Sequence, residues 1–448
     1  MLTEAYADTS VADLVHKRFL PVWVDAEQRP DISERYSFGG WPTTAFLAPD
    51  GRLLGGEMYA SAERLLELLP QVADAFNRQR ASFRKENYSV RQSRPFSLGK
   101  GPDASHAKWV REQLLERFDT DHGGFGNGAK RIQIDALELA SQYVRAGDRA
   151  FVPVVERTRR AIAFGGLLDK TDGGVFRYCA GRDWSDPSTE KLLTINAAAL
   201  RVFLEEDTYW PQAVNVLQFV RQTFVDNDDG NAGFFSSQQA DNTYYSTNPA
   251  GERRGIPPQV DSTVYADGTS RMARAYVRAA RVLNDESLLA FAVNAVEHVV
   301  IETYERGGGI AHETSQRSSM RGLLTDQVCA SSVLLDLYQE TEREVYLDMA
   351  QELMHFALRR LWDTVRGGFR DRVHNDDDLG LLREPIYPFH ANCEAARVLA
   401  RLARFSDRSV FRGRAELVLS SQNEVVRVYG VDGAAYVLAL NELQSSVC

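Results

Sequence analysis

Asp121-His-Gly-Gly-Phe125 is the first of five related loops in this chain of 448 residues. Each copy joins an acidic residue to nearby glycines and then to a large apolar residue. The later copies are Asp172-Gly-Gly-Val-Phe176, Asp229-Gly-Asn-Ala-Gly-Phe-Phe235, Glu305-Arg-Gly-Gly-Gly-Ile310 and Asp363-Thr-Val-Arg-Gly-Gly-Phe369. They recur every roughly 50 to 75 residues, and a pair of helix-like segments follows each one, which is typical of an array of supersecondary units.

The spacing of apolar side chains predicts twelve helices in residues 103–448. They cover residues 103–118, 131–146, 149–164, 189–206, 208–226, 262–283, 286–304, 323–341, 343–362, 388–405, 408–421 and 434–445. Very short links alternate with connections of roughly 12 to 35 residues, and short links give antiparallel hairpins. Five tandem hairpins, closed by the first and last helices, predict an (α/α)6 toroid in a mainly α protein. An open solenoid is the alternative.

The first 81 residues predict a smaller α/β unit. The apolar runs 19–25 and 43–48 have the composition of strands, Pro49-Asp-Gly51 reads as a turn, and residues 52–59 can return as the second strand of a hairpin. Helical spacing follows from Ala62 to about Arg80. Residues 82–102 are rich in Ser, Gly and Pro and read as a linker, which leaves 103–448 for the toroid.

Composition excludes several classes of function. The net charge is -10 without a block of Lys or Arg, which argues against nucleic acid and anionic membranes as partners. The four cysteines, Cys179, Cys329, Cys393 and Cys448, lie far apart, so no CxxC pair and no zinc-ligand spacing is present. We expect reduced thiols, a cytoplasmic location, no signal peptide, no membrane span, no metal and no cofactor.

Three N-terminal motifs carry a family resemblance. Val24-Asp-Ala-Glu-Gln-Arg-Pro-Asp31, the run 39–51 that includes Gly-Gly-Trp-Pro42, and Gly55-Gly-Glu-Met-Tyr59 resemble the spermatogenesis-associated, thioredoxin-like protein family (bacterial YyaL type). The resemblance implies a thioredoxin-like domain joined to a toroid of the six-hairpin glycosidase kind. A proline directly before a strand predicts a structural cis-Pro at Pro42.

Departures from the family pattern weaken its chemical motifs. Relatives usually carry Cys-His-Trp-Cys upstream of the part that matches this chain, so we expect a partial thioredoxin-like domain without its own redox motif, unless the true start lies upstream. Where relatives resemble Pro-His-Phe-Glu-Lys-Met-Leu-Tyr-Asp-Asn, this chain reads Pro187-Ser-Thr-Glu-Lys-Leu-Leu-Thr-Ile-Asn196. The Glu, Lys and Asn remain, whereas the His and the Tyr-Asp pair do not.

Candidate site residues lie in the long loops and at the starts of the inner helices, because these parts of a toroid meet at one end. Carboxylates and a histidine suit acid–base or glycosidic chemistry. Aromatic and amide side chains suit a sugar. The catalytic candidates are Glu190, Asp261, Asp326 and His390, and the ligand-binding candidates are Tyr178, Trp184, Lys191, Asn196, His312, Asn392 and Glu394. The alternative is structural: helix-terminal charges, a surface ion pair and a packed histidine.

Three functions follow from this sequence. The first is a thioredoxin-like protein without redox activity whose toroid holds a carbohydrate-like ligand or a partner's segment. The second is a carbohydrate-active enzyme, either a sugar epimerase or a glycoside hydrolase. The third is a thiol–disulfide oxidoreductase whose cysteine pair lies upstream of the given start.

Overall fold

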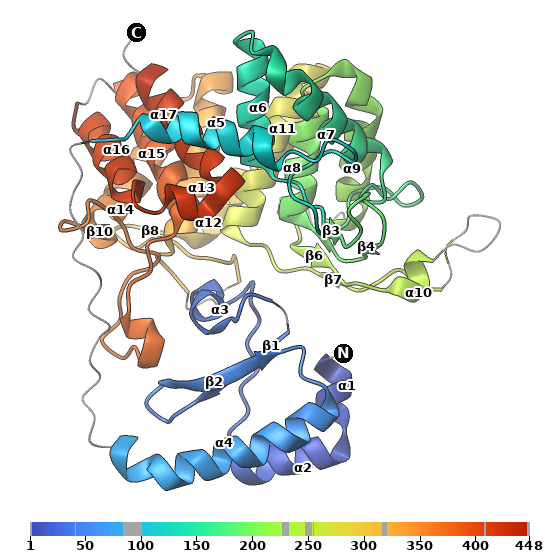
Figure 1. Cartoon of the computed structure of the whole chain (residues 1–448). Helices are drawn as coiled ribbons and strands as arrows, with labels where there is room; N and C mark the ends of the chain where they lie inside the picture. The colour runs from blue at the N-terminus through green and yellow to red at the C-terminus, as the bar shows by residue number, and fades with distance from the viewer. Residues whose placement is uncertain are drawn as a thin grey trace. The chain divides into compact units, whose positions relative to one another are not determined.

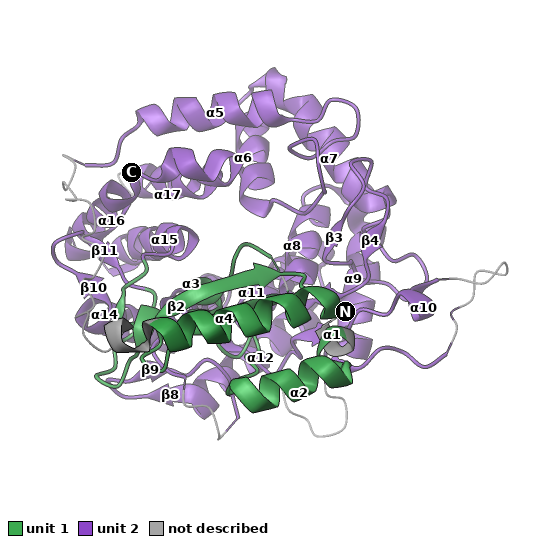
Figure 2. Cartoon of the chain, turned by 60° about the horizontal axis from the view of Figure 1, so that its bottom comes forward, with its two compact units in different colours: residues 1–97, 371–386 green, residues 98–370, 387–448 purple. Residues whose placement is uncertain are grey.

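The computed structural model divides the chain into two compact units (Figures 1 and 2). Unit 1 comprises Met1–Ser97 and Asp371–Ile386, and unit 2 comprises Leu98–Arg370 and Tyr387–Cys448. The structure describes residues 2–40, 42–83, 101–225, 233–246, 253, 255–315, 320–406 and 409–445. Most of the predicted linker 82–102 and the bond between Trp41 and Pro42 lie outside the described residues, so the predicted cis geometry stays a prediction.

Unit 1 contains a two-stranded antiparallel sheet and four helices in its N-terminal part. The elements are α1 (Leu2–Ala7), α2 (Thr9–Arg18), α3 (Pro30–Tyr36), β1 (Thr43–Leu47), β2 (Leu53–Met58) and α4 (Ala62–Phe83). Val11, Phe46, Leu65 and Leu69 form the centre of its apolar core. The predicted hairpin is confirmed by the antiparallel pairing of β1 with β2. The helix after it is confirmed too, and its helical apolar spacing buries Leu65, Leu69 and Ala73 on one face.

The run from Phe19 to Asp25 was predicted as a strand, and this prediction is wrong. These residues adopt no regular strand, and Leu20, Val22 and Trp23 are 90%, 75% and 74% exposed. A strand needs a hydrogen-bonding neighbour. In the described part of unit 1, β1 and β2 pair only with each other, so composition alone could not place this run in a sheet.

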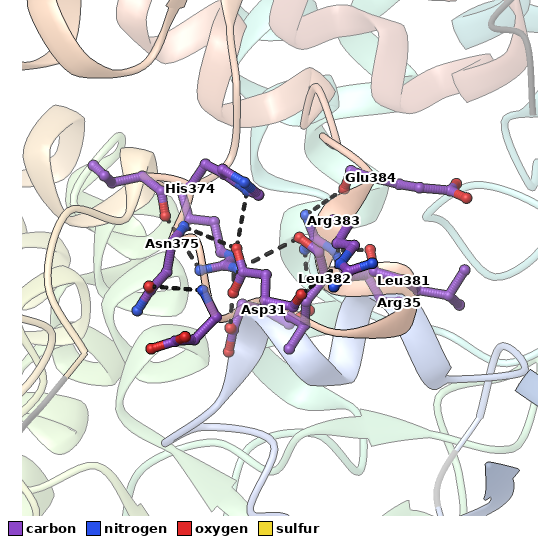
Figure 3. A network of polar contacts seen from close by, with 12 residues as sticks. Asp31, Arg35, His374, Asn375, Leu381, Leu382, Arg383 and Glu384 are labelled. Carbon is purple, nitrogen blue, oxygen red and sulfur yellow. Dashed lines mark hydrogen bonds and ion pairs between the residues drawn. The ribbon is translucent and has the colours of Figure 1, made fainter. Parts of the chain in front are cut away.

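A second piece of chain, residues 371–386, completes unit 1 (Figure 3). Arg35 on α3 donates hydrogen bonds of 2.6 and 3.1 Å to the carboxylate of Asp371, and further bonds to the carbonyls of Leu381 and Glu384. Both charged side chains are buried. The predicted toroid boundaries, 103–448, include this segment, whereas the structure packs it with the N-terminal residues.

Glycine is required where this segment approaches the β1–β2 turn. Gly51 and Gly380 have φ angles of +81° and +55°. A Cβ atom on Gly380 would lie 1.9 Å from the carbonyl oxygen of Gly51. The phenol of Tyr36 joins the same region, donating to the Gly51 carbonyl and accepting from the amide of Leu381.

Unit 2 contains the twelve predicted helices in an inner and an outer layer. Six inner helices are α6 (Ile134–Arg145), α8 (Leu193–Phe203), α11 (Ala266–Leu283), α13 (Leu324–Thr341), α15 (Phe389–Ser406) and α17 (Ala434–Ser445). Each inner helix contacts the next in this order, and α17 contacts α6. The ring is therefore closed, which confirms the toroid and rejects the open solenoid.

The outer layer and the loops follow the same repeat. The outer helices are α5 (Ser105–Arg117), α7 (Val152–Phe164), α9 (Trp210–Thr223), α12 (Glu286–Thr303), α14 (Glu344–Arg360) and α16 (Ser409–Gln422), and α10 (Asn242–Tyr245) lies in a loop. Short strands make up the loops: β3 (Tyr178–Cys179), β4 (Pro187–Ser188), β5 (Lys191–Leu192), β6 (Ser237–Gln238), β7 (Val260–Asp261), β8 (Tyr304–Glu305), β9 (Gly309–Ile310), β10 (Trp362–Asp363) and β11 (Gly368–Phe369). The Gly-Gly loops at 305–310 and 363–369 are the β8–β9 and β10–β11 hairpins.

The inner helices are rich in small side chains, which explains their place in the ring. Gly268, Ala273, Ala275 and Ala279 of α11 are all buried. Helices that carry small side chains on several faces can pack closely against several neighbouring helices. Among the described helices, none combines the length and the apolar character that a bilayer span requires.

Candidate functional site

A histidine and two carboxylates meet at the N-terminal ends of α11 and α13. His312 follows β9, Asp326 lies in the first turn of α13, and Asp267 lies in the first turn of α11. Nδ1 of His312 lies 3.0 and 3.1 Å from the two carboxylate oxygens of Asp326. One ligand atom from each of the three residues lies within 4.8 Å of the others.

The backbone fixes the histidine beside α11. The amide of His312 donates to the carbonyl of Met320, and its carbonyl accepts from the amide of Ala266, the first residue of α11. The ring of Tyr265 stacks on the imidazole, with 4.8 Å between the ring centroids and 30° between the planes. This packing holds the imidazole in one orientation toward Asp326.

Burial and charge tune the cluster. The side chains of Asp326 and His312 are buried, whereas that of Asp267 is 23% exposed. Burial raises the pKa of Asp326, His312 opposes this rise, and the nearby Asp267 carboxylate adds to it. Nε of Arg271 lies 3.7 Å from Asp267 and balances part of the negative charge. Asp267 is therefore the member of the cluster that solvent can reach.

The cluster offers two kinds of chemistry. A buried His–Asp pair can share and transfer a proton. One imidazole nitrogen and two carboxylates also suit a divalent transition-metal ion. The three ligands come from two helices and a loop, so sequence spacing could not reveal such a set. Asp267 is absent from the predicted site residues; its first-turn position on an inner helix was the available signal.

The structure brings His312 and Asp326 together and gives the other catalytic candidates local partners. Glu190 accepts a 2.7 Å hydrogen bond from Arg177. The carboxylate of Asp261 accepts from the amide and hydroxyl of Thr263 two residues later. These contacts are those of a surface ion pair and a turn.

His390 is half-exposed, on the first turn of α15. Its Nδ1 atom lies 3.7 Å from a carboxylate oxygen of Asp135. Its ring meets Phe389 and Tyr429 edge-on. This setting is that of a packed histidine beside a helix-terminal carboxylate, and its catalytic role stays a prediction.

Two of the ligand-binding candidates, Asn196 and Asn392, hold the loops. The side chain of Asn196 donates to the carbonyls of Val175 and Leu192 and accepts from the amide of Val175. The side chain of Asn392 bonds in the same way to Phe369 and Pro388. Both side chains are fully buried, so their hydrogen-bonding groups serve the backbone.

Lys191 and Trp184 also lie inside the loop layer. The ammonium of Lys191 donates 2.7 Å hydrogen bonds to Asp169 and to the carbonyl of Gly173. Trp184 is 1% exposed, and its indole N–H donates to the carbonyl of His122. Tyr178 is 38% exposed on β3 and is the most accessible aromatic among the candidates.

Glu394 belongs to an ion network between the inner helices. Its carboxylate accepts from Arg274 at 2.8 Å and from the hydroxyl of Ser332 at 2.6 Å. Burial alone would raise its pKa, but Arg274 and Arg397 hold that pKa well below the usual range of a glutamate. Glu394 is therefore an ionised link between α11, α13 and α15.

The three described cysteines have the properties of structural thiols. Cys179, Cys329 and Cys393 are buried and unpaired. Burial raises the pKa of Cys179 and of Cys329 to about 12 and that of Cys393 well above its ordinary value. Because the thiolate is the reactive form, these thiols are poor nucleophiles in the folded chain.

Comparison with known families and proteins begins with the N-terminal part. The family model Thioredox_DsbH, described as a protein of unknown function (DUF255), matches residues 1–93. An uncharacterized protein of Caenorhabditis elegans is 22% identical over 504 residues, covering 100% of this chain and 64% of its own length. Spermatogenesis-associated protein 20 of Mus musculus is 25% identical over 293 residues, covering 58% of this chain and 36% of its own length. The chain thus spans less than two thirds of these relatives.

Solved structures share the toroid. The cellobiose 2-epimerase of Spirochaeta thermophila has a TM-score of 0.58 at 14% identity, and the match covers 77% of this chain and 98% of the epimerase. A D-mannose isomerase gives a TM-score of 0.58 at 11% identity with the same coverage. Identities this low show a common fold and leave the activity open. The motifs, the domain model and the toroid agree, so the predicted resemblance to the spermatogenesis-associated, thioredoxin-like protein family is confirmed.

Proposed function

We propose that unit 2 binds a carbohydrate-like ligand where Asp267, His312 and Asp326 meet. The geometry of the cluster supports the proposal, because the partly exposed carboxylate of Asp267 lies within 4.8 Å of the buried His312–Asp326 pair. Sugar hydroxyls donate to carboxylates, and hydrogen bonds to an ionised acceptor are stronger than neutral ones. The toroid shared with sugar epimerases supports a carbohydrate by analogy of fold alone.

The His312–Asp326 pair favours a second candidate, a sugar epimerase or isomerase. Such an enzyme removes a proton from the carbon next to a carbonyl group and returns one to the same or a neighbouring carbon. A carboxylate 3.0 Å from Nδ1 of His312 fixes the imidazole tautomer. The pKa of Asp326, raised by burial, keeps a proton within the pair at a higher pH than a free aspartate would.

Thiol–disulfide exchange remains an alternative only for a longer protein. Residues 1–97 contain no cysteine, and the described thiols of unit 2 are buried with raised pKa values. A glycoside hydrolase also remains an alternative, since the paired carboxylates it needs could come from Asp267 and Asp326.

Calorimetric titration of the full chain with glucose, mannose, N-acetylglucosamine and cellobiose tests the proposal. At least one sugar should bind, and Asp267→Asn should weaken that binding at least tenfold, because the variant loses the charge on the exposed acceptor. Asp348→Asn, an exposed position on α14, is the matched control. The proposal is wrong if no sugar binds at millimolar concentration or if the two variants bind alike.

Proton transfer to and from the sugar is tested separately, by hydrogen exchange with the solvent. The sugar that binds is incubated with the protein in D2O, and proton NMR follows loss of signal at the carbon next to the carbonyl. An epimerase should exchange this hydrogen, and Asp326→Asn should slow the exchange at least tenfold while sugar binding persists. Binding without exchange would leave the binding function and reject the enzyme.

A further inference from the structure

We propose that a cavity of unit 2, whose lining does not include Asp267, His312 or Asp326, binds a small molecule carrying two or more phosphate or carboxylate groups. The cavity has a volume of about 440 Å³ and is lined by α6 along its whole length, by the C-terminal halves of α8, α11 and α13, and by Arg159 of α7 and Arg397 of α15. On α11 and α13 it therefore lies toward the ends opposite Asp267 and Asp326. Its size is that of a small-metabolite site.

The lining has an excess of positive charge. Seven arginines and four carboxylates line the cavity. Just outside the lining, Glu206 and Glu394 pair with Arg159, Arg274 and Arg397, and Arg401 pairs with Asp336, so eight guanidinium groups meet six carboxylates. An anionic ligand with two or more charges would compensate this excess. Arginine matches phosphate and carboxylate groups with two parallel hydrogen bonds, which lysine cannot provide.

Glu205 shows how incompletely these charges are compensated within the chain. Its single carboxylate lies 2.9 Å from Arg145, 3.6 Å from Arg159 and 2.6 Å from Arg278. Glu206 adds a contact of 3.6 Å to Arg159. Each guanidinium has five N–H donors, so three of them leave many donors beyond what one shared carboxylate can accept.

Unpartnered donors point to the same place. Arg159 is 7% exposed, and its buried Nε atom has no hydrogen-bond partner in the described structure. The Nε atom of Arg278 is also buried without a partner. A buried polar group without a partner is costly, and a bound anion would supply the missing acceptors.

A purely structural account explains only part of this arrangement. Cations in the last turn of a helix interact favourably with its dipole, which accounts for Arg145 on α6 and Arg281 on α11. Arg159 lies in α7, with five residues after it before the helix ends at Phe164. Its burial and its unpartnered Nε atom need a different explanation, and a ligand provides one.

Inorganic pyrophosphate and citrate are the probes, because each carries several negative charges, on phosphate groups in pyrophosphate and on carboxylate groups in citrate. Each is titrated calorimetrically into the full chain in 50 mM and 500 mM NaCl. We expect at least one to bind in low salt and to bind at least fivefold more weakly in high salt. The stronger probe identifies the chemical class. The proposal is overturned if neither probe produces heat of binding at millimolar concentration.

Arg278→Gln and Arg159→Gln should each weaken binding of that probe at least tenfold. Arg360→Gln, at an exposed position on α14, should leave it unchanged. Arg278 is 35% exposed, so its variant should keep the wild-type circular dichroism spectrum even if the Arg159 variant fails to fold. Equal weakening in the Arg360 and Arg278 variants would show non-specific charge attraction and overturn the site. Sugar binding at Asp267 should be unaffected by Arg278→Gln, which separates the two proposals.

Discussion

A carboxamide in the first turn of an inner helix fixes the Gly-Gly loop that precedes it. Asn196, Gln327 and Asn392 each bond to both the amide and the carbonyl of one loop residue: Val175, Ile310 and Phe369. A buried peptide group must find partners inside the protein. The repeated amide is therefore the residue-level device that lets a short hairpin lie buried against the ring.

Removing one of these amides should destabilise the toroid. Asn392→Ala leaves the buried amide and carbonyl of Phe369 without their partners, and we expect a loss of about 2–4 kcal/mol in the free energy of unfolding. Urea denaturation followed by circular dichroism measures it. Asn294→Ala, at an exposed position on α12, should cost less than about 0.5 kcal/mol. Similar losses in the two variants would contradict the structural role of the amide.

The candidate site shows what a sequence can and cannot tell at the scale of residues. His312 and Asp326 were each recognisable, one in a long loop and one in the first turn of an inner helix. Their hydrogen bond depends on the path of the loop, in which the amide of His312 bonds to Met320 and its carbonyl to Ala266. No spacing rule encodes that path. For the same reason, the sequence could not predict that the side chains of Asn196 and Lys191 are buried and bond to the loops.

Ion pairs between neighbouring helices tie the inner ring together. Glu138 of α6 accepts from Arg201 of α8 and Arg397 of α15, and Arg274 of α11 bonds to Asp336 of α13. Burial alone would raise the pKa of Glu138, but Arg397 and Arg201 hold it at about 2. A carboxyl whose pKa is lower in the folded than in the unfolded chain stabilises the fold when ionised.

Glu138 should therefore make the toroid acid-sensitive. The pKa of Glu138 falls from its ordinary value of 4.5 to about 2 in the folded chain. This shift corresponds to about 3 kcal/mol of folding stability, which is present above pH 4.5 and is lost as the pH falls toward 2. Glu138→Gln should be about 3 kcal/mol less stable than wild type at pH 7, because Arg201 loses its carboxylate partner and Arg397 keeps only Glu394.

The diagnostic result is the change in this gap with pH. Urea denaturation between pH 7 and pH 3 should show the gap between wild type and Glu138→Gln narrowing below pH 4.5. Glu302→Gln, at an exposed position on α12, should follow the wild-type curve throughout. A gap that stays constant with pH would show that Glu138 does not titrate as described.

The helices were the elements that the sequence predicted best, and a comparison of predicted with observed helix boundaries shows why. The apolar spacing placed α11 at 262–283 and α13 at 323–341, within a few residues of the observed Ala266–Leu283 and Leu324–Thr341. The predicted helix at 189–206 begins only at Leu193, because Lys191 and Leu192 pair with β6 as a strand. Local periodicity cannot register a partner from a distant loop.

At the scale of the whole molecule, unit 1 is discontinuous in sequence. The chain leaves unit 2 after Arg370 and returns to it at Tyr387. Residues 371–386 had the composition of another long loop, and nothing in their order indicated which unit they would join. The ion pair that joins Arg35 to Asp371 spans 336 positions in the sequence. Such non-local contacts form late, because a long loop must close first.

The stability of unit 1 should therefore depend on Arg35. Arg35→Ala leaves Asp371 buried without its partner and removes the donors to the carbonyls of Leu381 and Glu384. We expect a local loss of about 3–5 kcal/mol, as for other broken buried ion pairs. Hydrogen exchange measured by mass spectrometry should show faster exchange in α3 and in residues 371–386, with the inner helices of unit 2 unchanged.

The matched control is Arg18→Ala. Arg18 pairs with Asp74 at 2.8 Å, but both side chains are about half-exposed, and such a surface pair contributes less than about 1 kcal/mol. Its variant should exchange like wild type. If residues 371–386 keep their protection in Arg35→Ala, the segment is held by its own turns and its glycine contact, and unit 1 can form without the ion pair. If protection is lost there and kept in α13, the buried pair is the link that makes two distant stretches of chain fold as one unit.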